Sequence, residues 1–103
     1  MGYSLVVAPE FEDDLDAIVD YHVNQLHAPK AAKTLLDELD MAIELVQQIP
    51  TINAVSQKPL LRELGYREQQ VRKYVFLYRF DSETVFVMRM FHLTQDFECR
   101  IEE

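Results

Sequence analysis

Hydrophobic positions in the first half of the chain recur with helical spacing. A β-rich stretch, Tyr3 to Ala8, predicts a strand that ends at Pro9. Apolar residues then follow at intervals of three and four, which predicts a helix with one buried face and an acidic first turn. The members of this first stripe are Phe11, Leu15, Ile18, His22 and Leu26.

A second apolar stripe begins after Ala28-Pro29, because proline suits the first turn of a new helix. Its members are Ala32, Leu35, Leu36, Leu39, Ile43, Val46 and Ile49, and it runs to Pro50. A connection of about two residues between the stripes predicts an antiparallel helix hairpin.

Beyond Pro50 the pattern changes from helical to alternating. Residues 50–59 form a connection bounded by two prolines, and a strand is expected within 64–71, entering through Gly65. Residues 74–80 alternate aromatic with other side chains, which predicts a strand whose aromatic face packs against the helices.

The last part of the chain predicts a hairpin. Residues 81–84 have the composition of a turn and 85–91 that of a strand, and short structure is expected to continue through 97–101. The order β-α-α-β-β-β therefore predicts an α+β fold, with the N-terminal helix hairpin packed on one face of a small antiparallel sheet.

Composition supports one globular domain over residues 1–103. Hydrophobic residues make up 49% and charged residues 27%, which excludes a disordered chain. The single Cys99 excludes an internal disulfide framework. No membrane span or secretory signal is visible, so we expect a cytoplasmic protein. His22 and His27 lie five apart, which does not suit a metal pair on one helix face, and no metal or cofactor is expected.

Charge is distributed unevenly. The net charge is −8, which argues against nucleic-acid binding by bulk electrostatics. Residues 1–46 hold ten acids and two bases, whereas residues 58–79 hold six bases and two acids. The second half therefore either carries a cationic surface that meets an anionic partner or simply has solvated faces of uneven charge.

Several short sequence motifs occur in a characteristic order over nearly the whole chain. They are Ala8-Pro9 before Asp14-Leu15-Asp16-Ala17-Ile18-Val19-Asp20-Tyr21, Ala28-Pro29-Lys30-Ala31-Ala32, Ile49-Pro50, Tyr66-Arg67, Val71-Arg72-Lys73-Tyr74, Leu77-Tyr78 and His92-x-x-Gln95-Asp96. In this order and spacing the sequence resembles the RelE/ParE toxin superfamily of bacterial type II toxin–antitoxin modules.

The resemblance implies a small α+β toxin that inhibits growth and is neutralised by a cognate antitoxin protein. It also implies a role in plasmid stabilisation and contact with operator DNA only through the antitoxin. RelE-like members are ribosome-dependent nucleases that cut mRNA. ParE-like members poison DNA gyrase by binding.

The residues favour the ParE-like branch. RelE-like nucleases resemble one another in carrying an Arg directly after the Tyr of a Tyr-Arg-aliphatic-aliphatic-Tyr strand and a Lys pair on one strand. Here Val75 stands in the place of that Arg, and residues 66–70 contain no Lys pair. We therefore expect a protein that binds rather than an enzyme.

His92 keeps the nuclease alternative open. Its imidazole suits proton transfer near neutral pH, and some superfamily nucleases use a C-terminal His or Tyr in this way. The competing interpretation is a histidine that is hydrogen-bonded at a strand end and orients Gln95 and Asp96.

Candidate binding residues for the target or the antitoxin are Arg67, Arg72, Lys73, Tyr74, Arg89 and Gln95. The arginines suit bidentate binding of phosphate or carboxylate, or else they are solvent-facing strand residues or pair internally with Glu68 and Asp96. Arg72-Lys73 is expected at a hairpin turn, and Tyr66 and Tyr74 are the aromatic residues expected to reach solvent.

Three functions follow as hypotheses. The first is a ParE-like toxin that binds DNA gyrase, and the second is a ribosome-dependent mRNA interferase that uses His92 with Arg67, Arg72 and Arg89. The third is a relative that has lost toxicity and acts as a structural or regulatory partner.

Overall fold

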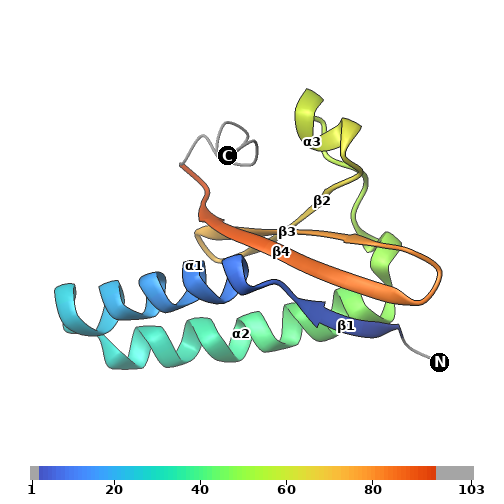
Figure 1. Cartoon of the computed structure of the whole chain (residues 1–103). Coiled ribbons are helices and arrows are strands. Elements are labelled where there is room, and N and C mark those ends of the chain that lie inside the picture. The colour runs from blue at the N-terminus through green and yellow to red at the C-terminus, as the bar shows by residue number, and fades with distance from the viewer. Residues whose placement is uncertain (1–2, 95–103) are drawn as a thin grey trace.

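A helix hairpin lies beneath a four-stranded sheet (Figure 1). The computed structural model describes residues 3–94. The elements in chain order are β1 (Ser4–Val7), α1 (Pro9–Asp20), a π-helical turn (Tyr21–Gln25), α2 (Pro29–Gln48), a 3₁₀ turn (Pro50–Ile52), α3 (Pro59–Glu63), β2 (Arg67–Val71), β3 (Tyr74–Phe80) and β4 (Thr84–His92). The predicted α+β class and element order are confirmed, and short α3 is an addition that the sequence did not predict. The structure expected over 97–101 lies outside the described residues.

The sheet is mixed rather than wholly antiparallel. Its strand order is β1-β4-β3-β2, and β1 pairs with β4 in parallel, with Ser4 opposite Thr84 and Val7 opposite Val87. The antiparallel helix pair returns the chain to the starting end of β1, so β2 runs in the same sense as β1. Because β3 then reverses and β4 reverses again, β4 comes to lie parallel to β1. The sequence predicted an antiparallel sheet, and this prediction is wrong for the pairing of β1 with β4.

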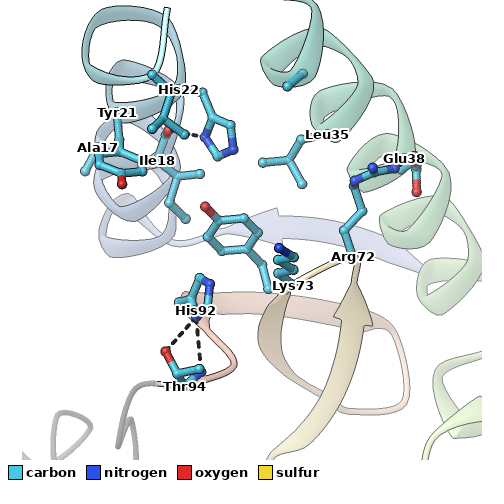
Figure 2. Close-up of a pocket in the computed structure, with 13 residues that line it drawn as sticks. Ala17, Ile18, Tyr21, His22, Leu35, Glu38, Arg72, Lys73, His92 and Thr94 are labelled. Carbon is cyan, nitrogen blue, oxygen red and sulfur yellow. Dashed lines mark hydrogen bonds and ion pairs between the residues drawn. The ribbon is translucent and has the colours of Figure 1, made fainter. Parts of the chain in front are cut away.

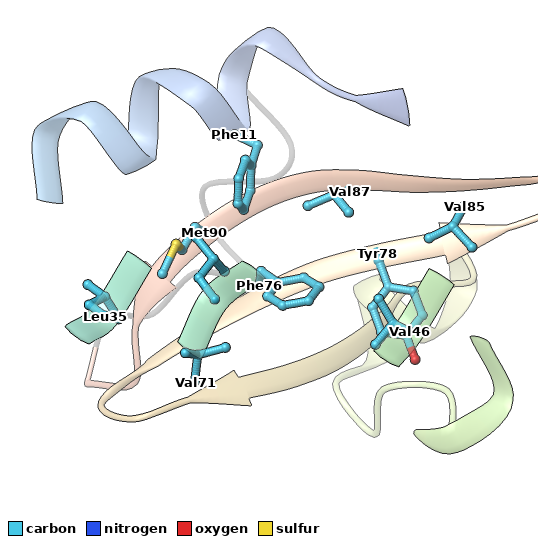
Figure 3. Close-up of a cluster of buried hydrophobic side chains, with 10 residues drawn as sticks. Phe11, Leu35, Val46, Val71, Phe76, Tyr78, Val85, Val87 and Met90 are labelled. Atoms are coloured by element: carbon cyan, nitrogen blue, oxygen red, sulfur yellow. The ribbon is translucent and has the colours of Figure 1, made fainter. Parts of the chain in front are cut away.

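The main core fills the space between the helices and the sheet (Figure 3). Alternation along β3 directs Phe76 and Tyr78 into it, both fully buried, as the aromatic pattern predicted. Helix residues on the two stripes meet them, with the ring centroids of Phe11 and Phe76 6.2 Å apart and edge to face. The buried members are Phe11, Leu35, Leu39, Val46, Val71, Phe76, Tyr78, Val85, Val87 and Met90.

A second, smaller core covers the opposite face of the sheet. Leu61 of α3 is fully buried there against Val75, Leu77 and Phe91. Tyr66 joins this cluster with 7% exposure, and the Arg79 guanidinium lies 5.4 Å from its ring centroid. The expectation that Tyr66 reaches solvent is therefore wrong, because α3 supplies a cover that the sequence did not predict.

Over residues 3–94, no helix has the length and apolarity required to cross a membrane.

Candidate functional site

An open pocket of about 1200 Å³ lies where the far end of the helix hairpin meets the sheet (Figure 2). Three parts of the chain converge on it: the end of α1 with the π turn, the beginning of α2, and the β2–β3 turn with the end of β4. Its lining residues are Ala17, Ile18, Tyr21, His22, Leu26, Ala31, Leu35, Glu38, Arg72, Lys73, Tyr74, His92 and Thr94.

The pocket brings together four of the seven residues that the sequence singled out. Arg72, Lys73, Tyr74 and His92 all line it, although 18 to 20 positions separate the first three from the last. The register of the β3–β4 hairpin explains this, because Tyr74 at the beginning of β3 lies opposite His92 at the end of β4. The candidate Gln95 lies outside the described residues.

Aromatic rings form a chain across the pocket. Ring centroids are 5.2 Å apart between His92 and Tyr74, 6.0 Å between Tyr74 and His22, and 6.0 Å between His22 and Tyr21. The first and last of these pairs are edge to face, the geometry that the ring quadrupoles favour. The four rings therefore form a continuous series of contacts from the sheet to the helix hairpin.

His22 and Tyr21 reach this chain from a π-helical turn. The N–H of Leu26 donates to the carbonyl of Tyr21 at 3.0 Å, five residues back, and this is the hydrogen-bond spacing of a π-helix. His22 Nδ1 donates to the carbonyl oxygen of Ile18 at 2.9 Å, which fixes the imidazole over the pocket. Sequence reasoning missed both side chains, because the helical period placed His22 on the core stripe and gave no sign of a π turn.

Tyr74 is the central ring of the chain. Partial burial, and to a smaller extent the nearby Tyr21 hydroxyl, raise the pKa of Tyr74 above its usual value of 10.0. The phenol therefore stays neutral at physiological pH. It is half-buried, so the expectation that it reaches solvent is met in part.

The cationic rim of the pocket comes from the two-residue turn between β2 and β3. Arg72 adopts a φ of 56° there, as the expected hairpin turn requires, and its Nη1 lies 2.6 Å from Oε2 of Glu38 on α2. This pair is about half exposed, so solvent screens it and it contributes little to stability. Lys73 has no ion pair with any residue in 3–94 and is exposed at the rim.

Arg67 and Arg89 do not line the pocket. The Arg67 guanidinium donates to the carbonyl oxygen of Asn53 and lies 5.2 Å from the ring centroid of Phe80. Nε of Arg89 lies 2.8 Å from Oδ2 of Asp14, a contact that raises the pKa of the Arg89 guanidinium despite its partial burial. Of the two internal partners suggested by the sequence, Asp96 lies outside the described residues.

Glu68, the other suggested partner, pairs with a different cation. Its carboxylate accepts the hydroxyl of Ser56 and lies 3.4 Å from Nζ of Lys58. Of the alternatives left open for the candidate arginines, pairing with Glu68 is therefore not observed within residues 3–94.

His92 is hydrogen-bonded at the end of β4. The backbone N–H of Thr94 donates to His92 Nδ1 at 3.2 Å, and the Thr94 hydroxyl lies 2.8 Å from the same nitrogen. A nitrogen that accepts an N–H carries no proton in the neutral ring, so Nε2 bears it. These bonds agree with the structural interpretation of His92, and Gln95 and Asp96 lie outside the described residues.

Val75, which stands where the nuclease pattern has its Arg, is 2% exposed in the second core. It therefore faces away from the helix hairpin. Over residues 3–94, no three His, Cys, Asp or Glu side chains gather as a metal site would require.

Comparison with known families assigns the chain. Residues 5–97 match the model of the ParE toxin of the type II toxin–antitoxin system parDE. The chain belongs to the ParE toxin family. A search of curated protein sequences finds no match.

Solved structures share the fold of this ParE family member. A chain of the chromosomal ParDE system from P. aeruginosa is 22% identical with a TM-score of 0.70, covering 87% of this chain and 95% of that one. A chain of the RelBE2 complex from Mycobacterium tuberculosis is 19% identical with a TM-score of 0.62, covering 89% and 92%. A chain of the E. coli DinJ-YafQ complex is 11% identical with a TM-score of 0.57, covering 89% and 93%. At these identities the likeness shows the fold alone.

Proposed function

We propose that this ParE family member is a growth-inhibiting toxin that binds DNA gyrase and is neutralised by a cognate antitoxin. The observation that supports the proposal most strongly is that the cationic side chains a nuclease would need do not lie together at one site. Arg67 and Arg89 are held by Asn53 and Asp14 outside the pocket, and Val75 is buried.

Cleavage of RNA through its 2′-hydroxyl requires a base, an acid and cations that converge on one phosphate. Around His92 the pocket supplies Lys73 and Arg72, and Arg72 is already paired with Glu38. Within residues 3–94 the pocket has an apolar wall, a chain of aromatic rings and one cation without an ion pair, Lys73. These features suit the docking of a protein segment better than the hydrolysis of a phosphodiester.

An antitoxin partner is supported by the solved relatives, because the ParDE, RelBE2 and DinJ-YafQ structures are named as toxin–antitoxin systems or complexes. The rim at Arg72 and Lys73 favours an acidic segment on whichever partner occupies the pocket. Operator DNA would then be contacted through the antitoxin, since this chain has a net charge of −8.

The test is a supercoiling assay with purified gyrase and relaxed plasmid. Excess toxin should block supercoiling, and a complex of the toxin with its antitoxin should not. In a parallel translation reaction, mRNA mapped by primer extension should stay intact. Normal supercoiling with excess folded toxin would reject gyrase as the target.

A ribosome-dependent interferase is the second candidate, favoured by the convergence of His92, Tyr74 and Lys73 in one pocket. It requires that His92→Ala abolishes both toxicity and codon-positioned cleavage while the protein stays folded. A His92→Ala variant that remains fully toxic would exclude this mechanism.

A further inference from the structure

The outer surface of the helix hairpin carries a second, shallower groove. Its volume is about 440 Å³, and its lining comes from α1, the π turn and α2. We define this hairpin groove by its lining residues, which are Leu15, Asp16, Val19, Asp20, Val23, Asn24 and Leu36. It shares no residue with the pocket around Tyr74.

Apolar residues of α1 and the π turn occupy two stripes rather than one. Phe11 and Ile18 belong to the stripe that packs into the main core. Val19 and Val23, four positions apart, line the hairpin groove and are not among the residues packed against the main core. Val23 is 37% exposed, so this second stripe leaves apolar surface in contact with water. The main core does not account for it.

Acidic side chains also line this groove. Asp16 and Asp20 line the groove and are exposed, and Asp20 accepts a hydrogen bond from the amide of Asn24. The two helices carry ten acidic residues, and only three of these are in ion pairs within residues 3–94. Lys30 and Lys33 are the bases on the same helices, and Lys33 is already paired with Asp37. The surface around the groove is therefore strongly negative.

The negative charge around the hairpin groove limits the kind of molecule that could bind there. Nucleic acid and anionic lipid would be repelled by this surface. A symmetric contact between the grooves of two copies would place Asp16 and Asp20 against acids of the same kind, which costs free energy. An apolar groove between two helices, with acidic borders, fits a third helix that has apolar residues on one face and basic residues beside them.

We propose that the hairpin groove binds a basic amphipathic helix of a partner protein, with its apolar side chains between α1 and α2 and its Lys or Arg side chains beside Asp16 and Asp20. This interaction goes beyond gyrase inhibition. It uses different residues and would persist if gyrase were not the target.

The test is an NMR titration of the full chain with its Leu and Val methyl groups labelled. The probe is a synthetic peptide of about 14 residues with Leu at helical spacing and Lys elsewhere, long enough for nearly four turns. The control peptide replaces every Lys with Glu. Saturable shifts of the Leu15, Val19, Val23 and Leu36 methyl groups with the Lys peptide alone are the expected result.

Two variants with the same change in net charge distinguish binding at the groove from non-specific electrostatic attraction of the peptide to the acidic protein. Asp16→Lys with Asp20→Lys should weaken Lys-peptide binding about tenfold or more, whereas Asp13→Lys with Glu63→Lys, outside the groove, should change it less than about twofold. Val19→Ser tests the apolar lining of the groove without altering charge and should also weaken binding. Circular dichroism checks that each variant is folded.

Each of the following outcomes would overturn the proposal. They are no saturable binding of the Lys peptide, equal binding of both peptides, shifts centred on the pocket around Tyr74, and equal effects of the two charge variants. Self-association through the groove in analytical ultracentrifugation would assign the surface to a second copy and would also reject it. None of these outcomes depends on whether the chain inhibits gyrase.

Discussion

Arg89 of β4 and Asp14 of α1 bind each other through two hydrogen bonds across 75 positions of the sequence. Nε lies 2.8 Å from Oδ2 and Nη2 lies 3.3 Å from Oδ1, and the backbone N–H of Met90 also donates to Oδ2 at 3.0 Å. The side chains are 24% and 19% exposed, so water screens this pair less than a surface ion pair. The pair fastens the helix hairpin to the central part of the sheet.

Removal of the Asp14 carboxylate should destabilise the protein. Asp14→Ala leaves a largely buried guanidinium and a backbone N–H without their acceptor, and we expect a loss of about 2 kcal/mol in the free energy of unfolding. Chemical denaturation measures it. The neighbouring Asp13 is exposed, and Asp13→Ala should change stability by less than about 0.5 kcal/mol. Equal effects of the two variants would contradict a structural role for the pair.

The hydroxyl of Tyr78 connects β3 to the segment after α2. It donates to the carbonyl oxygen of Pro50 at 2.8 Å and lies 3.2 Å from Nδ2 of Asn53, and the side chain is fully buried. Tyr78→Phe should therefore cost about 1 to 2 kcal/mol of stability, measured by denaturation. Tyr74→Phe is the comparison, because no hydrogen bond of the Tyr74 hydroxyl is found within residues 3–94, and it should be close to neutral.

Alkaline pH gives a second measurement on Tyr78. Burial is the main reason why the pKa of Tyr78 is raised above 10.0 in the folded protein. A group with a raised folded pKa contributes stability below its unfolded pKa and loses it as pH rises through the folded value. Unfolding free energy should therefore fall above about pH 10, and less steeply in Tyr78→Phe. An unchanged slope in that variant would contradict this assignment.

Asp81 organises the turn between β3 and β4. Its Oδ1 accepts the backbone N–H groups of Glu83 and Thr84, each at 2.8 Å, and these bonds lower the pKa of Asp81 below 3.8. A lowered pKa contributes stability above the unfolded value and loses it as pH falls through the folded value. Asp81→Ala should lower the melting temperature at neutral pH, and its difference from wild type should shrink below about pH 3.8. Ser82→Ala serves as the control in the same turn, and a pH-independent difference would argue against the carboxylate.

The proposed target interaction can be tested at Lys73. Its ammonium group is exposed at the pocket rim, so Lys73→Glu should lower the potency of gyrase inhibition about tenfold or more without unfolding the protein. Arg62→Glu on α3 makes the same charge change on an exposed side chain away from the pocket and should be neutral. If both variants inhibit as wild type does, the pocket rim is not the binding surface for the target.

Prediction from the sequence succeeded where neighbours in the chain decide the structure. The two apolar stripes gave the helix hairpin, and the alternation in 74–80 gave the buried positions of Phe76 and Tyr78. The turn at Arg72-Lys73 was also confirmed. The partner of Arg89 was not predicted, because nothing local indicates that β4 lies against α1.

At the candidate site, too, contacts between distant segments could not be predicted from the sequence. Arg67, Arg72 and Arg89 are chemically alike in the sequence, yet the fold places one at the pocket and commits the other two to internal contacts. His22 was dismissed with the metal hypothesis and lies on the pocket wall. A side chain's helical position gives its face, but what occupies the space opposite depends on segments far along the chain.

The sequence by itself determined the fold class, the helix hairpin and the family phrases, because periodicity and turn chemistry are local properties of the chain. The tertiary structure alone decided that β1 runs parallel to β4, that α3 covers the second face of the sheet, and that Tyr74 and His92 meet His22. These features depend on the number of chain reversals and on the packing of distant segments, which no local pattern encodes.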